Sequence, residues 1–391
     1  MVASVYVHLP FCRGRCPYCD FVSNDVTGVP AAPYAEALAA EWRWRASIPG
    51  GAGPFETVYL GGGTPSLWPA SCLAELLRSL PMADGAEVTV EANPGDADEA
   101  WYRELVAAGV TRFSIGVQAL DGDRLRWLGR RHGVDDAARA VRYAAASGAR
   151  EVSADLIYGT PGHTPSLAVD EARGLVGLGV DHVSAYELTV APGTPLGRRA
   201  TAISLGLPDE DALIRTWDAL GATLAGLGLE RYEVSSYAAP GRRSRHNENY
   251  WRGGQYVGLG AGAHGFLMGE GGCGEGGSAG TRGGRYANSA RLEDYLDAAR
   301  AGRFPEHGGG IGAGAIFDPV DAAARAREIV MLGLRWIEGV DLDELARLAG
   351  PVRTAALSSS LAGDGYARVA GRRLVPTRDG MLIADALAAR F

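Results

Sequence analysis

The stretch HLPFCRGRCPYCDF, residues 8–21, places Cys12, Cys16 and Cys19 close together with the spacing C-x3-C-x2-C. A loop this short can hold three thiolates around one small inorganic cluster. A 4Fe–4S cluster has four irons, so three protein ligands leave one iron open to an outside ligand. The spacing therefore predicts a cluster that can bind a small molecule directly.

Two simpler interpretations of the cysteines compete with a cluster. A structural zinc site needs four ligands, usually as two pairs, and His8 alone could supply a fourth here. Free cysteines are also often buried and inert. However, Pro10, Gly14 and Pro17 mark a loop instead of a core strand. We therefore favour the cluster.

The composition limits the class of protein. The chain has 391 residues, of which 47% are hydrophobic, enough for a large core and two or three domains. A formal net charge of −8 gives no global basic field for nucleic acid. Five cysteines, three of them clustered, fit a reducing cytosol better than a disulfide framework. We see no signal peptide and no apolar run of about 20 residues, so we expect a cytoplasmic protein.

Short β-branched runs alternate with amphipathic helical patterns up to about residue 237. The alternation predicts an α/β fold, a partial (β/α)6 barrel with a parallel sheet and outer helices. Ligands of such barrels bind at the carboxyl ends of the strands. The expected strands are residues 4–8, 57–60, 87–91, 112–116, 151–156 and 182–188. The expected helices are residues 33–46, 70–80, 98–108, 135–147, 167–178 and 209–227.

The remaining sequence suggests two further parts, so we expect domains at 1–237, 238–318 and 319–391. Residues 269–284 are glycine-rich and read as a flexible insertion, with Cys273 as an incidental thiol. Residues 342–390 contain helical patterns and a hairpin that turns at 370–371, which predicts a winged-helix-like module. Its presumed second helix carries Arg353 alone, so we expect a structural role instead of DNA binding.

Polar groups follow the expected strands where their carboxyl ends should meet. The glycine triplet 61–63 follows the second strand and could let backbone come close to a ligand. Glu91 ends the third strand, Gln118 ends the fourth, and Asp155 lies on the fifth. Each could be a satisfied buried polar group, but three at one end of a sheet favour a polar ligand. Arg130 would accompany them.

Six motifs carry a resemblance that covers most of the chain. They are CRGRCPYCDF (12–21), GGGTPS (61–66), VEANP (90–94), SIGVQ (114–118), DLIYGTPG (155–162) and RHNENYW (245–251). With them the chain resembles the radical S-adenosylmethionine (SAM) superfamily, more narrowly its HemN/HemW group, and within that group the haem chaperones of the HemW type. The resemblance implies a scaffold capable of reductive SAM cleavage. It also implies a 4Fe–4S cluster held by the three cysteines. The implied SAM contacts are Tyr6, Gly62, Gly63, Thr64, Glu91, Gln118, Arg130 and Asp155.

Two parts of the sequence indicate which branch of the HemN/HemW group the chain resembles. HemN-type dehydrogenases usually carry a further cysteine two residues after the third, where this chain has Phe21. In HemW-like proteins the H-N-x-x-Y-W stretch is associated with haem, which makes His246 the suspected iron ligand. His246 could equally be a hydrogen-bonded loop residue, and His264 is a rival ligand. The tryptophan often found in a later motif is absent, which leaves Arg285-Tyr286-Ala287-Asn288.

The favoured interpretation is a haem carrier that passes haem to acceptor proteins, with a cluster and SAM as cofactors. Acceptors at a membrane and a homodimer are possible partners, and no nucleic acid is expected. Three alternatives stay open. They are an oxygen-independent coproporphyrinogen III dehydrogenase of porphyrin biosynthesis, a HemN-like radical SAM methyltransferase, and a DNA-binding regulator that uses the tail.

Overall fold

A computed structural model describes residues 2–25, 28–47, 53–200, 204–268, 284–304 and 316–391. The glycine-rich insertion predicted at 269–284, with Cys273, lies outside the described residues except for Gly284. Among the described residues, no helix combines the length and apolarity that a membrane crossing requires.

Nine of the described strands form one large sheet in the order β11-β1-β4-β5-β6-β7-β8-β10-β9. All neighbours from β11 to β8 are parallel, whereas β10 runs antiparallel to both β8 and β9. The six predicted strands are confirmed, each with slightly different ends. The bounds are β1 (Ser4–Leu9), β4 (Phe55–Gly62), β5 (Met82–Ala92), β6 (Arg112–Gln118), β7 (Glu151–Tyr158), β8 (His182–Glu187), β9 (Glu230–Arg231), β10 (Ser236–Ala238) and β11 (Val257–Leu259).

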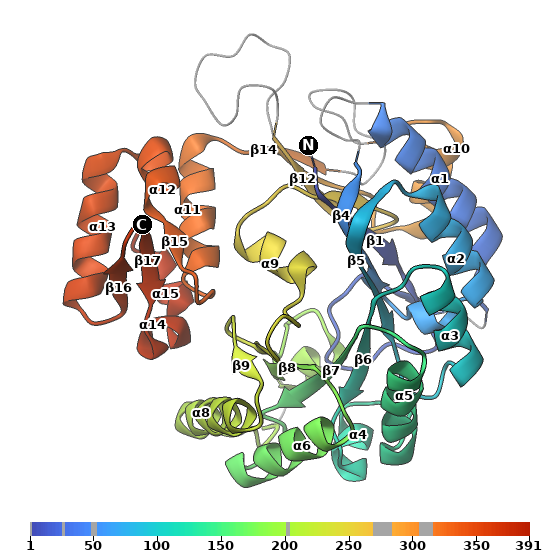
Figure 1. The fold of residues 1–391 in the computed structure, drawn as a ribbon, viewed down its shortest axis with the longest axis horizontal. Coiled ribbons are helices and arrows are strands. Elements are labelled where there is room, and N and C mark those ends of the chain that lie inside the picture. Colours follow the sequence, from blue (N-terminus) through green and yellow to red (C-terminus); the bar gives the residue numbers. More distant parts are fainter. Residues whose placement is uncertain (1, 26–27, 48–52, 201–203, 269–283, 305–315) are drawn as a thin grey trace.

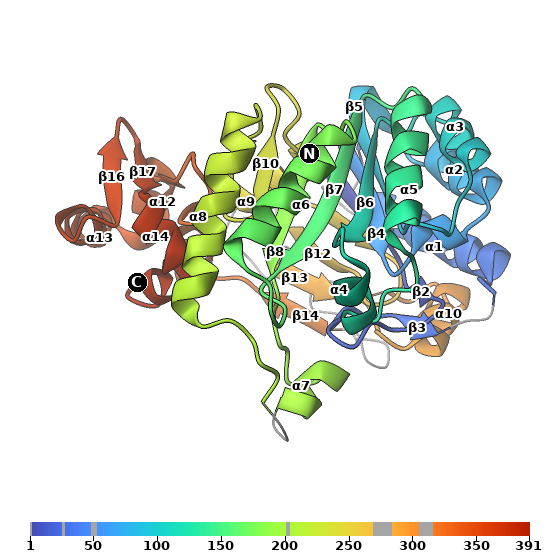
Figure 2. The same cartoon turned by 90° about the horizontal axis from the view of Figure 1, so that it is seen from below.

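Helices cover the outside of this sheet. Figures 1 and 2 show the strands curving into an open barrel with the long helices around it. The predicted α/β class and partial barrel are thereby confirmed. The outer helices are α1 (Ala31–Ala46), α2 (Ala70–Ser79), α3 (Glu99–Ala107), α5 (Val134–Ala146), α6 (Pro165–Gly177) and α8 (Glu210–Gly226). Shorter helical turns are η1 (Pro65–Leu67), α4 (Gly122–Trp127) and α7 (Pro195–Ala200).

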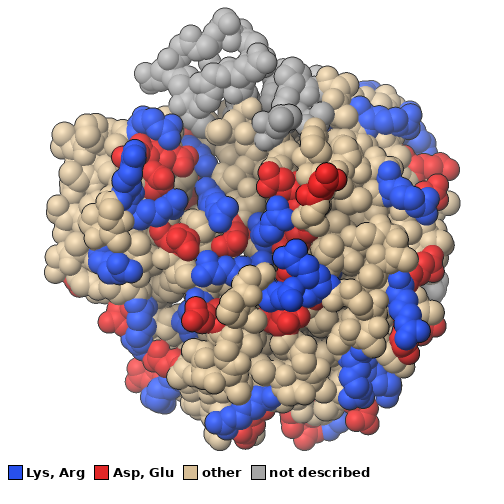
Figure 3. Space-filling model, viewed as in Figure 1, with Lys and Arg blue, Asp and Glu red and all other residues tan. Residues whose placement is uncertain are grey.

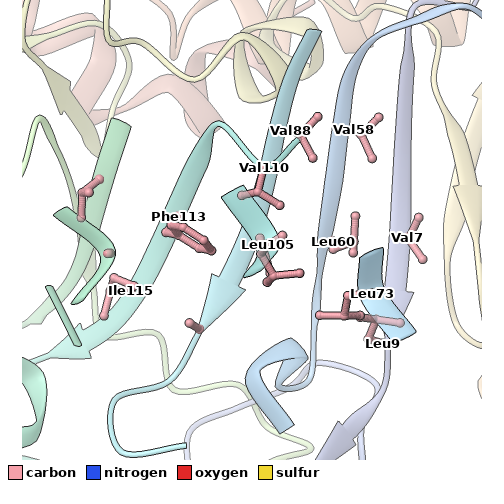
Figure 4. Close-up of a cluster of buried hydrophobic side chains, with 14 of the residues drawn as sticks. Val7, Leu9, Val58, Leu60, Leu73, Val88, Leu105, Val110, Phe113 and Ile115 are labelled. Atoms are coloured by element: carbon pink, nitrogen blue, oxygen red, sulfur yellow. The ribbon is translucent and has the colours of Figure 1, made fainter. Parts of the chain in front are cut away.

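Alternation along the strands separates an apolar outer face from a polar inner face. Side chains of the outer face are fully buried against the helices, as Val7 and Leu60 are against Leu73 of α2 (Figure 4). Phe113 lies in the same cluster near Leu105 of α3. The inner face carries hydroxyls, imidazoles and charges instead. The barrel interior is therefore the polar compartment of the molecule.

The segment predicted as a separate middle part completes the barrel. Its strand β11 pairs with β1, and helix α9 (Arg245–Trp251) lies at the opening of the barrel in Figure 1. The predicted boundary at residue 237 falls inside β10. A small antiparallel sheet, β12-β13-β14, and a helix follow. Their bounds are β12 (His264–Leu267), β13 (Gly284–Ala287), β14 (Ile316–Pro319) and α10 (Leu292–Arg300).

The last part has its own hydrophobic core and lies beside α8 and α9 (Figures 1 and 2). Its three-stranded sheet has the order β15-β17-β16, with the predicted hairpin between the last two strands. Arg353, the lone charged side chain of α13, lies over the ring of Phe391. The bounds are α11 (Ala322–Gly333), β15 (Val340–Asp341), α12 (Leu342–Ala349), α13 (Pro351–Gly363), β16 (Ala367–Ala370), β17 (Arg373–Pro376), α14 (Arg378–Leu382) and α15 (Ala384–Ala388).

A buried network around Glu41 ties helix α1 to the segment that follows β11. One carboxylate oxygen accepts from the backbone N–H of Gly260 at 2.9 Å and from the Tyr295 hydroxyl at 2.9 Å. The other accepts from Arg45 Nε at 2.7 Å and from the Asn288 amide at 2.8 Å. The motif residue Asn288 therefore has a structural role here.

Replacing Glu41 by Ala should destabilise the fold strongly. The substitution leaves the buried guanidinium of Arg45 without its counter-charge, and breaking a buried ion pair costs about 3 kcal/mol or more. We expect a fall of that size in the free energy of unfolding measured with urea. The control is Glu36→Ala on an exposed position of the same helix, which should change it by less than about 0.5 kcal/mol. Equal effects of the two substitutions would contradict this account of the network.

Candidate functional site

A cavity of about 390 Å³ opens at the carboxyl ends of the barrel strands. All three predicted cluster cysteines line it, and seven of the eight predicted SAM contacts line it with them. Tyr6 is not among the lining residues, and its hydroxyl bonds His8 Nδ1 at 2.8 Å. The seven are Gly62, Gly63, Thr64, Glu91, Gln118, Arg130 and Asp155.

The cysteine loop is closed at its base and stiffened across its middle. Strand β2 (Phe11–Cys12) pairs in parallel with β3 (Asn24–Asp25), so the chain returns to where the loop begins. Arg15 bridges the interior of the loop by donating to the carbonyls of Cys19 and Phe21, each at 3.1 Å. His8 bonds the Val22 carbonyl at 2.8 Å through Nε2. Since both its ring nitrogens are engaged, His8 is unsuited to be the fourth zinc ligand considered above.

Two of the predicted SAM contacts touch cysteine sulfurs. The Thr64 hydroxyl donates to Cys12 Sγ at 3.6 Å, and Arg130 Nη1 donates to Cys16 Sγ at 3.6 Å. Hydrogen bonds to sulfur are one means by which proteins adjust an iron–sulfur cluster. Burial raises the pKa of the Cys12 and Cys19 thiols, so thiolates here need a cationic partner.

The glycine triplet is explained by close packing inside the protein. Gly62 has φ +106°, and a Cβ there would lie 2.2 Å from His8 Nδ1. A Cβ on Gly63 would lie 2.6 Å from the backbone nitrogen of Phe11. The Gly63 N–H donates to the Leu9 carbonyl at 3.0 Å. The glycines therefore let the loop that follows β4 pack directly against the cysteine loop.

Two carboxyl groups line the cavity with raised pKa values. Burial raises the pKa of Glu91 to about 7, although the Tyr59 hydroxyl and the Gly62 N–H both donate to its carboxylate, at 2.8 and 3.0 Å. Burial also raises the pKa of Asp155 to about 6, against the opposing effect of Arg112. Both carboxylates would be stabilised by a cationic ligand in the cavity.

Backbone strain is present at the same rim. Gln118 has φ +67° and is the sole non-glycine residue with positive φ in the described part of the chain. It ends β6 where the register with β7 shifts. Unfavourable backbone conformations of this kind cluster at ligand sites, because the surrounding structure holds them in place. Gln118, which the sequence predicted as a polar residue of the site, therefore also has a strained backbone.

Several residues of the cavity were not predicted as site residues, although Asn93, Ser114 and Asn247 stand in the motifs quoted above. The set shares an inward position or a place just beyond a strand end, and it includes Tyr59, Asn93, Arg112, Ser114, Ser184, Tyr186 and Asn247. Arg112 is buried, and its Nε has no hydrogen-bond partner among the described residues. The signal that could have found most of them is the polar residue at every second position of the strands.

The two candidate haem ligands have opposite environments. His246 is 1% exposed, and its ring bonds the Thr57 hydroxyl at 2.8 Å and the Tyr250 hydroxyl at 2.9 Å. Burial lowers the pKa of His246 to about 3, so the imidazole is neutral. His264 is exposed, and its ring has no hydrogen-bond partner in the described part of the chain. Iron ligation by His246 would require one of these two hydrogen bonds to break, and the predicted role stays a prediction.

The donor set suits an iron–sulfur cluster with a ligand at its side. Three free cysteines face one cavity, and polar groups for a charged ligand share that cavity. Across the described ranges, no group of three His, Cys, Asp or Glu side chains is arranged to hold a single metal ion.

Charges of both signs are interspersed over the face of the molecule shown in Figure 3.

Comparison with known proteins places this geometry in a family. Residues 6–172 match the Radical SAM superfamily. The protein named heme chaperone HemW of Mycobacterium tuberculosis is 37% identical over 390 residues, covering 98% of this chain and 93% of that protein. The Escherichia coli protein of the same name is 39% identical, covering 67% of this chain and 69% of that protein.

A solved structure shares the fold. Coproporphyrinogen III oxidase (HemN) from Escherichia coli, described as a radical SAM enzyme, superposes with a TM-score of 0.78. The match covers 99% of this chain and 89% of that chain at 20% sequence identity. The likeness extends over the barrel and the last part, so both have the same arrangement in the two proteins.

Glu91→Gln should change how stability depends on pH. Because the folded pKa of about 7 exceeds the ordinary 4.5, the protein without cofactors loses stability as pH rises through this interval. The amide cannot ionise, so the stability of the variant relative to wild type should increase from pH 5 to pH 8. Urea unfolding at both pH values measures this difference.

Glu104→Gln, at an exposed position, is the control for Glu91→Gln. It should show the same pH dependence as wild type. A parallel pH dependence of wild type and Glu91→Gln would contradict the raised pKa.

Proposed function

Because the chain belongs to the HemW family of the radical SAM superfamily, we propose that it is a haem chaperone that binds haem and delivers it to acceptor proteins. The identity of 37% across 98% of the chain to a protein named heme chaperone HemW is the observation that carries this proposal. The cofactors proposed are a 4Fe–4S cluster and SAM, and haem is the cargo.

The cavity supports the proposed cofactors residue by residue. Cys12, Cys16 and Cys19 would hold the cluster, whose open iron would bind the amino and carboxylate groups of SAM. When bound, the pair supplies one-electron reductive chemistry. The protein's own contributions are the hydrogen bonds to the sulfurs and the carboxyl groups of Glu91 and Asp155. Those carboxylates would stabilise a cationic sulfonium when ionised.

The proposed role as a carrier rests on sequence more than on fold. The solved HemN structure has the same fold as this chain, so fold alone does not separate a carrier from a dehydrogenase. The difference lies at Phe21, which is 62% exposed and lines the cavity two residues after Cys19. A phenylalanine there cannot ligate metal and presents an apolar ring to solvent. A cytoplasmic location, a membrane acceptor and a homodimer stay predictions.

Cys16→Ala should abolish the cluster. After anaerobic reconstitution, the wild-type protein should contain iron and sulfide near four of each per chain and absorb broadly in the visible range. Loss of one of three cluster ligands should remove most of both signals. Cys72→Ala, a free cysteine outside the cavity lining, is the matched control and should match wild type. Unchanged iron and sulfide in Cys16→Ala would overturn the cluster assignment.

The carrier and the dehydrogenase make different chemical predictions. We expect haem titration to give a saturable Soret band. We also expect that the reconstituted protein, given SAM, a reductant, an electron acceptor and coproporphyrinogen III without oxygen, forms no protoporphyrinogen. Product analysis by chromatography measures the second outcome. Formation of protoporphyrinogen at many turnovers per chain would favour the dehydrogenase instead.

A further inference from the structure

Helix α9 carries the histidine of the RHNENYW segment into the barrel, and the residue after it reaches the cluster cavity. Asn247 lines the same cavity as the three cysteines. The backbone N–H of Asn247 is bonded to Ser244 Oγ at 3.3 Å, the N-cap contact of the helix. Its side-chain amide, in contrast, has no hydrogen-bond partner among the described residues. An amide can both donate and accept, so Asn247 offers two kinds of hydrogen bond to a ligand.

The beginning of α9 is fixed by contacts with the inner face of the sheet. The Glu87 carboxylate accepts from the backbone N–H of Arg245 at 2.8 Å and of His246 at 3.0 Å. A carboxylate at a helix N-terminus satisfies free N–H groups and complements the helix dipole. The His246 ring bonds Thr57, whose hydroxyl also donates to Ser4 at 2.9 Å. Helix α9 is thereby bound to β1, β4 and β5.

His246 also contacts the cavity by a second route. Its ring packs on Tyr59 with ring centroids 5.1 Å apart, and the Tyr59 hydroxyl donates to Glu91 at 2.8 Å. The opposite ring nitrogen bonds the Tyr250 hydroxyl, one helical turn further on. His246 therefore supports one cavity residue through the backbone and another through stacking. Every polar atom of the ring is used in these contacts.

We propose that His246 is a positioning residue of the cluster cavity and that the side-chain amide of Asn247 hydrogen-bonds SAM there. The inference rests on the proposed function, since it takes SAM as the ligand of this cavity. It assigns the HN pair of the segment to the SAM site instead of to haem iron. A cavity amide without a protein partner is the expected state of a group that hydrogen-bonds a ligand.

The test measures SAM affinity and haem binding separately in the same variants. Titration of SAM into the anaerobically reconstituted protein gives a dissociation constant, and haem titration gives the Soret band. We expect Asn247→Ala to weaken SAM binding about tenfold, as for the loss of one hydrogen bond in a buried site. Because the Asn247 side chain has no hydrogen-bond partner in the described part of the chain, this variant should fold like wild type.

His246 variants separate positioning from ligation. His246→Ala should weaken SAM binding at least as much as Asn247→Ala while the Soret band is retained. His246→Gln, whose amide can form one or both ring hydrogen bonds, should recover part of the lost SAM affinity. Arg245→Ala removes an exposed side chain from the same segment and should stay within about twofold of wild type.

Three results decide between the possibilities. A SAM affinity of Asn247→Ala within about twofold of wild type would overturn the inference and leave the proposed function intact. Loss of the Soret band in His246→Ala with unchanged SAM affinity would assign the histidine to haem and also overturn it. A reconstituted wild-type protein that binds neither SAM nor haem would remove the proposed function itself.

Discussion

The parallel pairing of β1 with β4 is the contact on which the site depends. In this register His8 lies beside Gly61 and Leu9 beside Gly62, so the two loops that follow leave the sheet side by side. Nothing larger than glycine fits between them, since a Cβ at Gly62 would overlap the His8 ring. The cysteine loop and the polar rim are therefore held together by backbone packing, and the sulfur atoms need no covalent link to come to one cavity.

The sheet, the outer helices and the polar residues at the carboxyl ends of the strands could be predicted from the sequence, because each depends on local patterns. Periodic apolar residues identify strands and helices, and parallel strands bring residues such as Glu91 and Asp155 to one end. The return of β11 to the edge of β1 was not predictable in this way. It depends on pairing across some 250 residues, which no local pattern encodes. The same limit applies to Arg112, whose importance comes from the carboxylates that other strands place around it.

The histidine of the RHNENYW segment illustrates how a motif and its setting can differ. As a sequence, an imidazole beside aromatic residues suggests a metal ligand. In the fold, the same imidazole lies between Thr57 and Tyr250 and is kept neutral by burial. Asn288 of a second motif is likewise enclosed with Glu41. A motif residue can thus support the architecture around a cavity without contacting a ligand itself.

The network around Glu41 has a consequence for synthesis on the ribosome. Helix α1 and strand β1 emerge among the first residues, yet Gly260, Asn288 and Tyr295, which satisfy Glu41, emerge after two thirds of the chain. Until then Arg45 is the one donor of this network that has emerged for the Glu41 carboxylate, and the first strand has one edge unpaired. Unpaired edges are where chains associate wrongly. The barrel can therefore close only late in translation, and the cysteine loop that follows the first strand stays accessible until then.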